Sequence, residues 1–200
     1  MPFILALDTT GDAGSLALAN GPTLIEEVAI TTREGFGQIL FGELEQLLAR
    51  HEVTWSDIAC FASAAGPGSF TGVRVGLTAV KGLADASDAK VVGVSNLQAL
   101  AWFGSGDLRA PCMDARRGEI YGAVYDGQLH LVQDETVTLY DAWAASLPEG
   151  AVPIPQGPPL ARAVAAIAWQ RFEAGDAQDA ASIDANYVRR SDAEMMWREL

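Results

Sequence analysis

The sequence predicts an α/β protein with two related lobes, each built on a mixed β-sheet flanked by helices. Two observations lead to this prediction. One apolar run ends at Asp8 and another at Asp114, and after each aspartate the chain turns through glycine and returns as further strand-like segments. Between such segments, apolar residues recur at helical spacing. The repeated design indicates two lobes, although the residues of the two halves barely match.

The first half contains segments of both periodicities. Its strand-like segments are short and apolar or alternating, and its two helical segments repeat apolar residues every three or four positions. In chain order, we expect strands at 3–7, 15–19 and 24–30, a helix at 39–50, a strand at 58–62, a helix at 71–85 and a strand at 91–94.

The second half opens with predicted strands at 110–113, 119–125 and 129–139. A proline-rich stretch follows, and we expect it to be a loop because proline fits neither a helix interior nor a central strand. The prolines are Pro153, Pro155, Pro158 and Pro159. A helix at 160–172 comes after them.

Size and charge narrow the class of protein. With 200 residues, half of them apolar, the chain can bury a substantial core, so it should form one globular unit or two small lobes. We assign residues 1–104 to the first lobe and residues 105–200 to a second, shortened lobe whose C-terminal segment can return to the first. The net charge of −13 repels phosphate backbones, which disfavours independent nucleic-acid binding.

The N-terminus and the cysteines indicate the compartment. The first apolar run stops at Asp8, far short of a signal sequence or a membrane span, so we expect a cytoplasmic protein without a membrane partner. Cys60 and Cys112 each lie in an apolar strand-like stretch, and two thiols make no disulfide framework. We interpret both as reduced core residues.

A glycine-rich loop, GPGSFTG at 66–72, follows a strand and begins the second predicted helix. Amides at a helix N-terminus attract anions, so phosphate binding is one interpretation, with Arg74 and Lys81 further along the helix. The other is a tight strand-to-helix connection that binds nothing and is capped by Ser69. We favour the second, because many such turns bind nothing. The loop is not a Walker motif, since no Gly-Lys-Ser/Thr follows.

The two helices of the first half suggest a surface for a protein partner. Small residues of the second helix, Gly72 and Gly76 among them, fall near one face, and the first helix carries more apolar positions than one core-facing stripe needs. Packing inside the lobe explains the small-residue face equally well. The hypothesis of a partner interface names Phe36, Ile39, Leu40, Gly72, Val73, Gly76 and Val80.

The sequence offers no convincing catalytic or metal site. Its only histidines, His51 and His130, are far apart and lie in no cluster of carboxylates or thiolates. His51 ends a helix, where the helix dipole explains it, and we place His130 on a half-exposed strand. Ser69 would need a base to act as a nucleophile, and no histidine lies near it in sequence.

Asp8 and Asp114 end equivalent strands and would therefore face one cleft. In a working ATPase of this architecture, nucleotide and Mg²⁺ would sit there. The loops after the two aspartates lack glycine-rich phosphate hairpins, and Arg116 and Arg117 are bulky. We therefore expect no ATP hydrolysis by the chain alone, while a weak nucleotide contact that partner subunits complete, with Arg116 and Arg117 at its positive end, stays open.

Recognisable motifs lie at 4–10, 66–76, 81–84, 93–97 and 114–121, and at 187–189 with 193–194. In this order and spacing they closely resemble the TsaB family of tRNA threonylcarbamoyladenosine biosynthesis. The block GPGSFTGVRVG is specific, whereas the Asp-Thr-Thr opening alone would be weak. The resemblance runs over nearly the whole chain.

The resemblance implies an actin-like, ribonuclease H-like fold and a non-catalytic role. The implied partner is TsaD, the related subunit that transfers the threonylcarbamoyl group to adenosine 37 of tRNA, with the ATPase TsaE in a larger complex. It also implies self-association through the same helical face when the partner is absent, and contact with tRNA only through the complex. We expect no cofactor of its own, although ATP or ADP could bind at the junction with partner subunits. The alternatives are a stand-alone actin-like ATPase or small-molecule kinase, and a free-standing tRNA-binding module.

Overall fold

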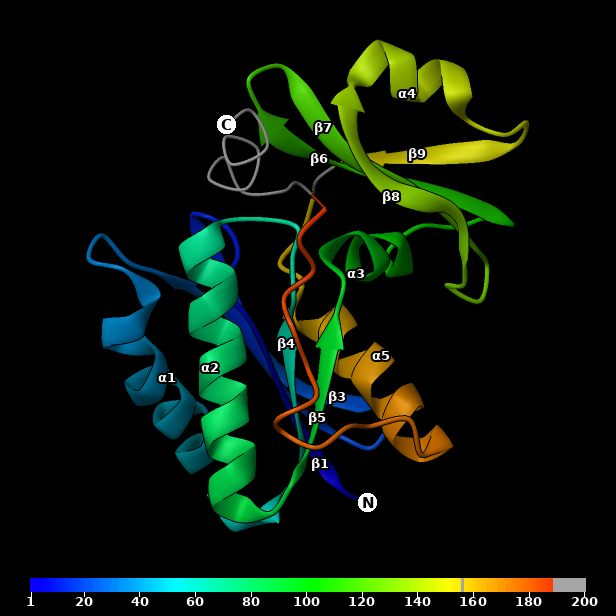
Figure 1. Cartoon of the computed structure of the whole chain (residues 1–200). Helices are drawn as coiled ribbons and strands as arrows, with labels where there is room; N and C mark the ends of the chain where they lie inside the picture. Colours follow the sequence, from blue (N-terminus) through cyan, green and yellow to red (C-terminus); the bar gives the residue numbers. More distant parts are fainter. Residues whose placement is uncertain (156, 189–200) are drawn as a thin grey trace.

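The structure, a computed structural model, describes residues 1–155 and 157–188. It contains two mixed β-sheets flanked by helices, which confirms the predicted α/β class (Figure 1). The first sheet has the strand order β3-β2-β1-β4-β5, and the second has the order β8-β7-β6-β9.

The first sheet combines a meander with two parallel strands. Strands β1 (Phe3–Asp8), β2 (Ala13–Asn20) and β3 (Thr23–Thr31) are antiparallel neighbours. Strands β4 (Ile58–Ala64) and β5 (Lys90–Val94) run parallel to β1, because long crossovers connect them. The sheet is therefore antiparallel on one side of β1 and parallel on the other.

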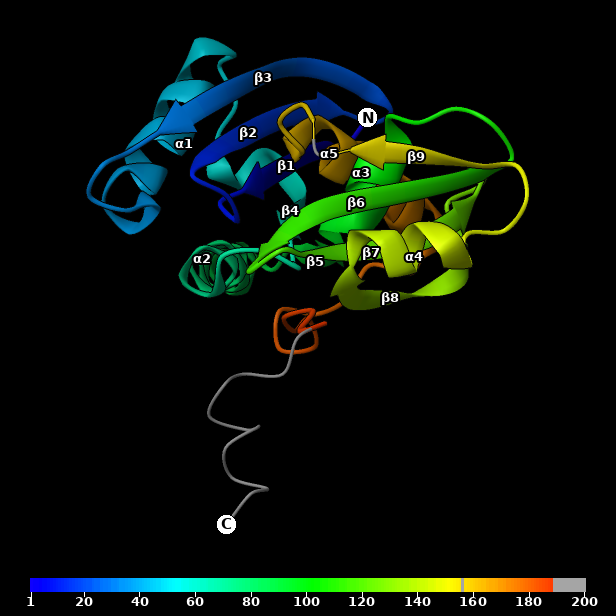
Figure 2. The same ribbon diagram turned by 90° about the horizontal axis from the view of Figure 1, so that it is seen from above.

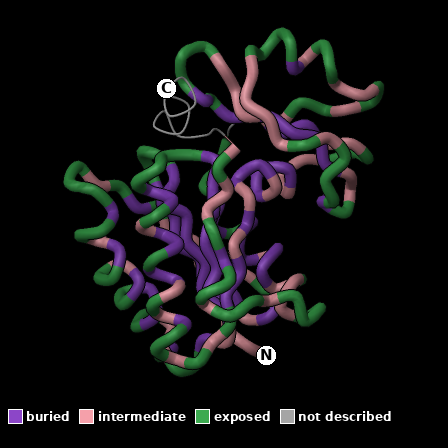
Figure 3. The backbone as a smooth tube through the Cα atoms, viewed as in Figure 1, coloured by how far each residue is buried: buried purple, intermediate pink, exposed green. Residues whose placement is uncertain are grey.

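Alternation along the strands gives the first sheet two buried faces. Leu5 and Leu7 of β1 pack with α1 (Phe36–Arg50) and α2 (Phe70–Ser87), whereas Ile4 and Ala6 pack with α5 (Ala161–Ala174). Burial is accordingly concentrated in the strands and on the inward faces of the helices (Figure 3). A short 3₁₀ turn, η1 (Trp55–Asp57), leads into β4.

The second sheet pairs β6 (Leu108–Arg116), β7 (Glu119–Asp126) and β8 (Leu131–Leu139) antiparallel, and places β9 (Ala151–Pro155) parallel to β6. Helix α3 (Asn96–Trp102) lies between the two sheets and contacts β6 and β7 (Figures 1 and 2).

Helix α4 (Tyr140–Ser146) covers the other face of the second sheet through the fully buried Trp143.

The structure corrects several expectations about the chain. Pro153 and Pro155 lie in β9 and not in a loop; β9 is an edge strand, which tolerates proline because one side of it forms no ladder. His130 lies in the turn before β8 and is exposed, and Cys112 is only half-buried. Helices α3 and α4 were not expected, since seven residues are too few to establish a helical period.

The chain returns to the first sheet after β9. Helix α5 packs against β1, β2 and β4. We term residues 178–187, which follow α5, the C-terminal strap. Gln178 of the strap pairs with Val91 at the edge of β5. Ile183 is buried in the core cluster on the face of the sheet that α1 and α2 cover. The division of the chain at residue 104 stays a prediction.

None of the helices in the described part of the chain is both long and apolar enough to cross a membrane.

Candidate functional site

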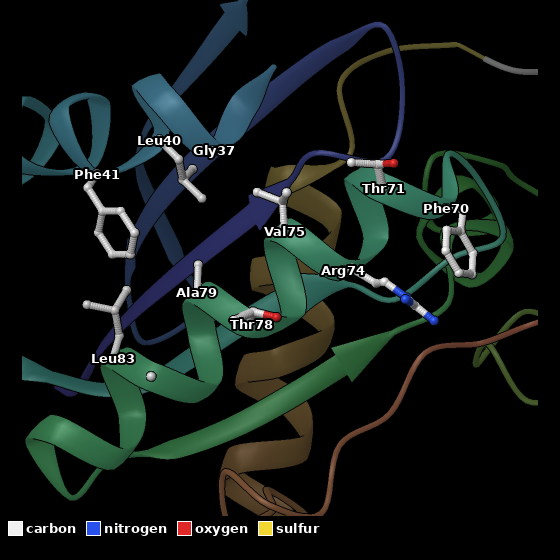
Figure 4. A pocket seen from close by; sticks show the side chains of 11 residues that line it. Gly37, Leu40, Phe41, Phe70, Thr71, Arg74, Val75, Thr78, Ala79 and Leu83 are labelled. Carbon is white, nitrogen blue, oxygen red and sulfur yellow. The ribbon is translucent and has the colours of Figure 1, made fainter. Parts of the chain in front are cut away.

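An apolar groove of about 710 Å³ lies between helices α1 and α2 on the surface (Figure 4). Phe41 of α1 points toward Leu83 of α2, and its side chain is 49% exposed. Other residues of α2 along the groove are Phe70, Val75, Thr78 and Gly82, with the buried Ala79 at its base. An exposed hollow with so little polar lining is typical of a surface that another chain covers.

The start of α2 is fixed by the glycine-rich loop. Ser69 accepts a hydrogen bond from the backbone amide of Gly72 (3.3 Å), so it caps the helix as the sequence predicted. The amide of Ser69 is itself bound to the carbonyl oxygen of Thr10 at 2.8 Å. These bonds fix the direction of α2 and therefore which of its faces meets solvent.

The structure buries most residues of the predicted partner interface inside the chain. Gly76 packs over side chains of β1 and β4, and an added Cβ at Gly72 would overlap the carbonyl oxygen of Thr9. The small-residue face of α2 therefore allows close packing on the chain's own sheet. The residues buried in this way are Phe36, Leu40, Gly72, Val73, Gly76 and Val80.

The remaining residue of that set, Ile39, is half-buried against the same core cluster. Leu40 is the one residue of the set that also lines the groove. The groove residues that the sequence did not single out, such as Thr78 and Gly82, lie on the adjoining face of α2. The sequence feature that could have revealed them is their spacing: Thr78 and Gly82 are small residues four positions apart, so they lie on the same side of α2.

A second cavity, of about 790 Å³, lies where the two sheets meet the start of α2. Asp8, Asp114, Arg116 and Arg117 all line it, so the structure brings together the four residues that the sequence proposed for a nucleotide contact. Residues 68–71 of the glycine-rich loop and of the first turn of α2 line the same cavity.

The two aspartates of this cavity differ in environment. Asp8 is 6% exposed; burial raises the pKa of its carboxyl group, and hydrogen bonds to Oδ1 from the amide of Thr10 (2.9 Å) and from its hydroxyl (2.6 Å) oppose this. Asp114 is exposed and accepts a hydrogen bond from the amide of Arg116 at 2.7 Å. Arg116 and Arg117 both have positive φ, so the turn that carries them is tight.

The candidates for catalysis are engaged elsewhere. His51 lies 2.6 Å from Glu26, and His130 lies 3.1 Å from Asp126, so the structure brings neither to Ser69. Burial raises the pKa of the Cys60 thiol to about 12. Within residues 1–155 and 157–188, no three or more of His, Cys, Asp and Glu form a group that could hold a metal ion.

Comparison with known proteins gives a consistent family. The family model of TsaD, tRNA N6-adenosine threonylcarbamoyltransferase, matches residues 31–182. The tRNA threonylcarbamoyladenosine biosynthesis protein TsaB of Escherichia coli is 38% identical over 126 residues, which are 61% of this chain and 54% of that protein. TsaB of Bacillus subtilis is 34% identical over 157 residues, 76% of this chain and 68% of that protein. The chain thus spans between half and about two thirds of the length of these relatives.

Solved structures agree with this result. YeaZ from Pseudomonas aeruginosa has a TM-score of 0.78 and 26% identity, and the match covers 94% of this chain and all of that one. A second structure from the same organism, described as an uncharacterized protein with similarity to peptidase YEAZ, has a TM-score of 0.80 and 25% identity over the same shares.

Proposed function

The chain belongs to the TsaB family, and from this membership we propose that it is a non-catalytic subunit that binds and activates TsaD in tRNA threonylcarbamoyladenosine biosynthesis. The observation that supports the proposal most strongly is the groove between α1 and α2, where Phe41 and Phe70 are each 49% exposed. Large exposed apolar side chains around one hollow are costly unless a partner covers them.

The shape of the groove favours helices as the partner element. Two helices form its walls, and Thr78 and Gly82 place only small side chains along it, so a helix laid along α2 could approach closely. In the absence of TsaD, a second copy of the chain would meet the same need. Contact with tRNA would then come only through the complex, in keeping with the net charge of −13.

Two glycines provide a sharp test. Gly82 lines the groove and Gly42 lies on α1 outside it, and a Cβ added at either would meet no atom within 4 Å. Gly82→Glu should therefore leave the fold intact and block the groove, whereas Gly42→Glu adds the same charge without blocking it. We would mix each variant with cognate TsaD and measure association by sedimentation velocity.

We expect wild type and Gly42→Glu to form a heterodimer with TsaD and Gly82→Glu to remain apart from it. The same substitution should abolish self-association of the isolated chain. Heterodimer formation by Gly82→Glu with unchanged affinity would exclude the groove as the interface.

We also propose that the cavity around Asp8 and Asp114 makes a weak contact with ATP or ADP that TsaD and TsaE complete. The positive end would be Arg116 and Arg117, which line the cavity together with the first turn of α2.

A stand-alone ATPase or small-molecule kinase is the alternative, and the meeting of Asp8 and Asp114 at one cavity is the observation in its favour. In that case the purified chain would turn over ATP, and Asp8→Asn would remove the activity. Absence of turnover in the isolated chain would exclude this alternative.

A further inference from the structure

Three side chains form a compact cluster at the N-terminal end of α2. The rings of Phe70 and Tyr187 are stacked with centroids 5.7 Å apart. The guanidinium group of Arg74 lies over the Phe70 ring, 3.9 Å from its centroid, and its Nε donates a hydrogen bond of 3.1 Å to the Tyr187 hydroxyl. Residues 113 positions apart in the sequence thus hold one guanidinium group in place.

The cluster is exposed and continuous with the groove. Phe70 and Arg74 line the groove, and Phe70 and Tyr187 are 49% and 48% exposed. Arginine and aromatic residues are the types that contribute most to binding at protein interfaces. A partner helix that fills the groove would therefore reach this cluster at one of its ends.

Tyr187 is held in position by the C-terminal strap. The amide of Asn186 donates to the carbonyl oxygen of Ala65 (2.7 Å), and its side chain donates to the carbonyl oxygen of Gly66 (3.3 Å) and to Glu135 (2.6 Å). Because the preceding residue is fixed at three points, little conformational entropy would be lost at Tyr187 when a partner binds.

Arg74 retains hydrogen-bonding capacity. Its Nε is used by Tyr187, and within the described residues no carboxylate forms an ion pair with Arg74. The two terminal guanidinium nitrogens form a planar fork that matches the two oxygens of a carboxylate. The chain has 13 lysines and arginines against 26 aspartates and glutamates, so a cation beside an apolar surface stands out from the rest of the sequence.

We propose that Arg74, Phe70 and Tyr187 form a recognition site for one carboxylate side chain of the partner segment that fills the groove. Tyr187 orients the guanidinium group through Nε, and Phe70 supports its face, so that the terminal nitrogens bind the carboxylate. The proposal rests on the proposed function, because it takes the groove as the TsaD interface. It adds a polar specificity contact, supplied in part by the strap, to an otherwise apolar surface.

The test measures the affinity of full-length variants for cognate TsaD at two salt concentrations. Arg74→Gln removes the charge and the fork, and we expect a loss of about tenfold or more at low salt that becomes smaller at high salt. Arg74→Lys should restore only part of the affinity, because an ammonium group makes no bidentate contact. Arg162→Gln is the control for charge, since Arg162 pairs with Glu27 on the α5 side of the molecule.

Tyr187 provides the second pair of variants. Tyr187→Phe keeps the stacked ring and loses the bond to Arg74, and we expect a weaker effect than that of Tyr187→Ala, which loses both. Thermal unfolding of each variant would establish that the chain is folded.

The outcomes separate this inference from the proposed function. If Gly82→Glu blocks association while the Arg74 and Tyr187 variants bind as the wild type does, the carboxylate site is wrong and the groove remains the interface. A loss for Arg74→Gln that Arg74→Lys fully restores, or that does not change with salt, would also contradict bidentate recognition. If Gly82→Glu associates normally, the proposed interface itself fails.

Discussion

Helix α2 is joined to the end of strand β1 through Gly72 and Thr9. The hydroxyl of Thr9 donates a hydrogen bond of 2.7 Å to the carbonyl oxygen of Gly72, and a Cβ on Gly72 would overlap the carbonyl oxygen of Thr9. No side chain therefore fits between the two backbones, and glycine is required here for packing inside the chain.

Gly72→Ala should accordingly destabilise the fold. The added methyl group must displace backbone atoms, so we expect the free energy of unfolding to fall by about 3 kcal/mol. Urea denaturation would measure it. Gly82→Ala is the matched control, because its Cβ meets open space, and it should raise the stability by up to about 1 kcal/mol. Equal stability of the two variants would contradict the packing described here.

Glu135 connects the second sheet to the first lobe and to the strap. Its carboxylate accepts hydrogen bonds from Ser95, from the hydroxyl of Tyr125 (2.5 Å) and from Asn186. Glu135→Ala leaves these donors without their acceptor, and we expect a cost of about 2 to 3 kcal/mol.

The same substitution should make the C-terminal strap more sensitive to limited proteolysis, because Asn186 loses one of its three anchors. Asp134→Ala, at the exposed neighbouring position, serves as the control and should change neither stability nor cleavage. A strap that stays equally protected in both variants would show that Glu135 does not hold it.

Cys60 should resist alkylation in the folded protein. Burial raises the pKa of its thiol to about 12, so that near pH 8 the reactive thiolate is about a thousandfold scarcer than for an ordinary thiol of pKa 9.0. Because the pKa is raised in the folded state, this thiol favours folding below pH 9 and loses that contribution as the pH rises toward 12.

Mass spectrometry after iodoacetamide treatment would measure the labelling of each cysteine. We expect Cys60 to be modified only after unfolding and the half-buried Cys112 to react sooner. Rapid modification of Cys60 in the native state would contradict its burial.

Glu26 should make stability depend on acid pH. Hydrogen bonds from Arg50 and then from His51 lower the pKa of its carboxyl group below the ordinary value of 4.5. The contribution is therefore present above pH 4.5 and is lost as the pH falls through the folded-state pKa. At pH 7, Glu26→Gln should cost less than about 1 kcal/mol, because the group is near the surface.

Chemical denaturation at pH 7 and at pH 2 would test this difference between Glu26→Gln and the wild type. We expect it to become smaller at pH 2, as the wild-type carboxyl group takes up its proton, and to shrink in 1 M salt. A difference of equal size at both pH values would indicate a cause other than charge.

The nucleotide contact predicts an effect of Arg116 that depends on the partners. With TsaD and TsaE present, Arg116→Ala should weaken the binding of fluorescently labelled ATP by about tenfold, through loss of a cation that lines the cavity. Arg33→Ala, at an exposed position outside the residues that line this cavity, should have no effect. Unchanged binding in Arg116→Ala would remove this residue from the contact.

Much of the fold could be predicted from the spacing of apolar residues and from the glycine-rich turns. The alternation in β1 sends Leu5 and Leu7 to one face and Ile4 and Ala6 to the other, and the structure buries both faces. The glycine-rich loop predicted the start of α2 and its cap at Ser69. These are local properties, set by residues a few positions apart, and they can therefore be predicted from a single sequence.

The residues of the candidate site could be predicted only in part from the sequence. Asp8, Asp114, Arg116 and Arg117 were correctly placed around one cavity, because equivalent strand ends meet at the junction of related lobes. The partner surface was predicted on the face of α2 that carries Gly72 and Gly76, and the structure packs that face against the chain's own sheet. The contact of Tyr187 with Phe70 had no sequence signal, since the two residues lie in unrelated segments.

The sequence by itself determined which residues share a face of each strand and helix, because the chain geometry fixes their spacing. Only the tertiary structure decided what covers each face: the sheet covers Gly72 and Gly76, solvent meets Thr78 and Gly82, and the strap brings Tyr187 to Arg74. The physical reason is that a face is buried only when another surface packs against it, and the residues of that second surface lie far away in the chain.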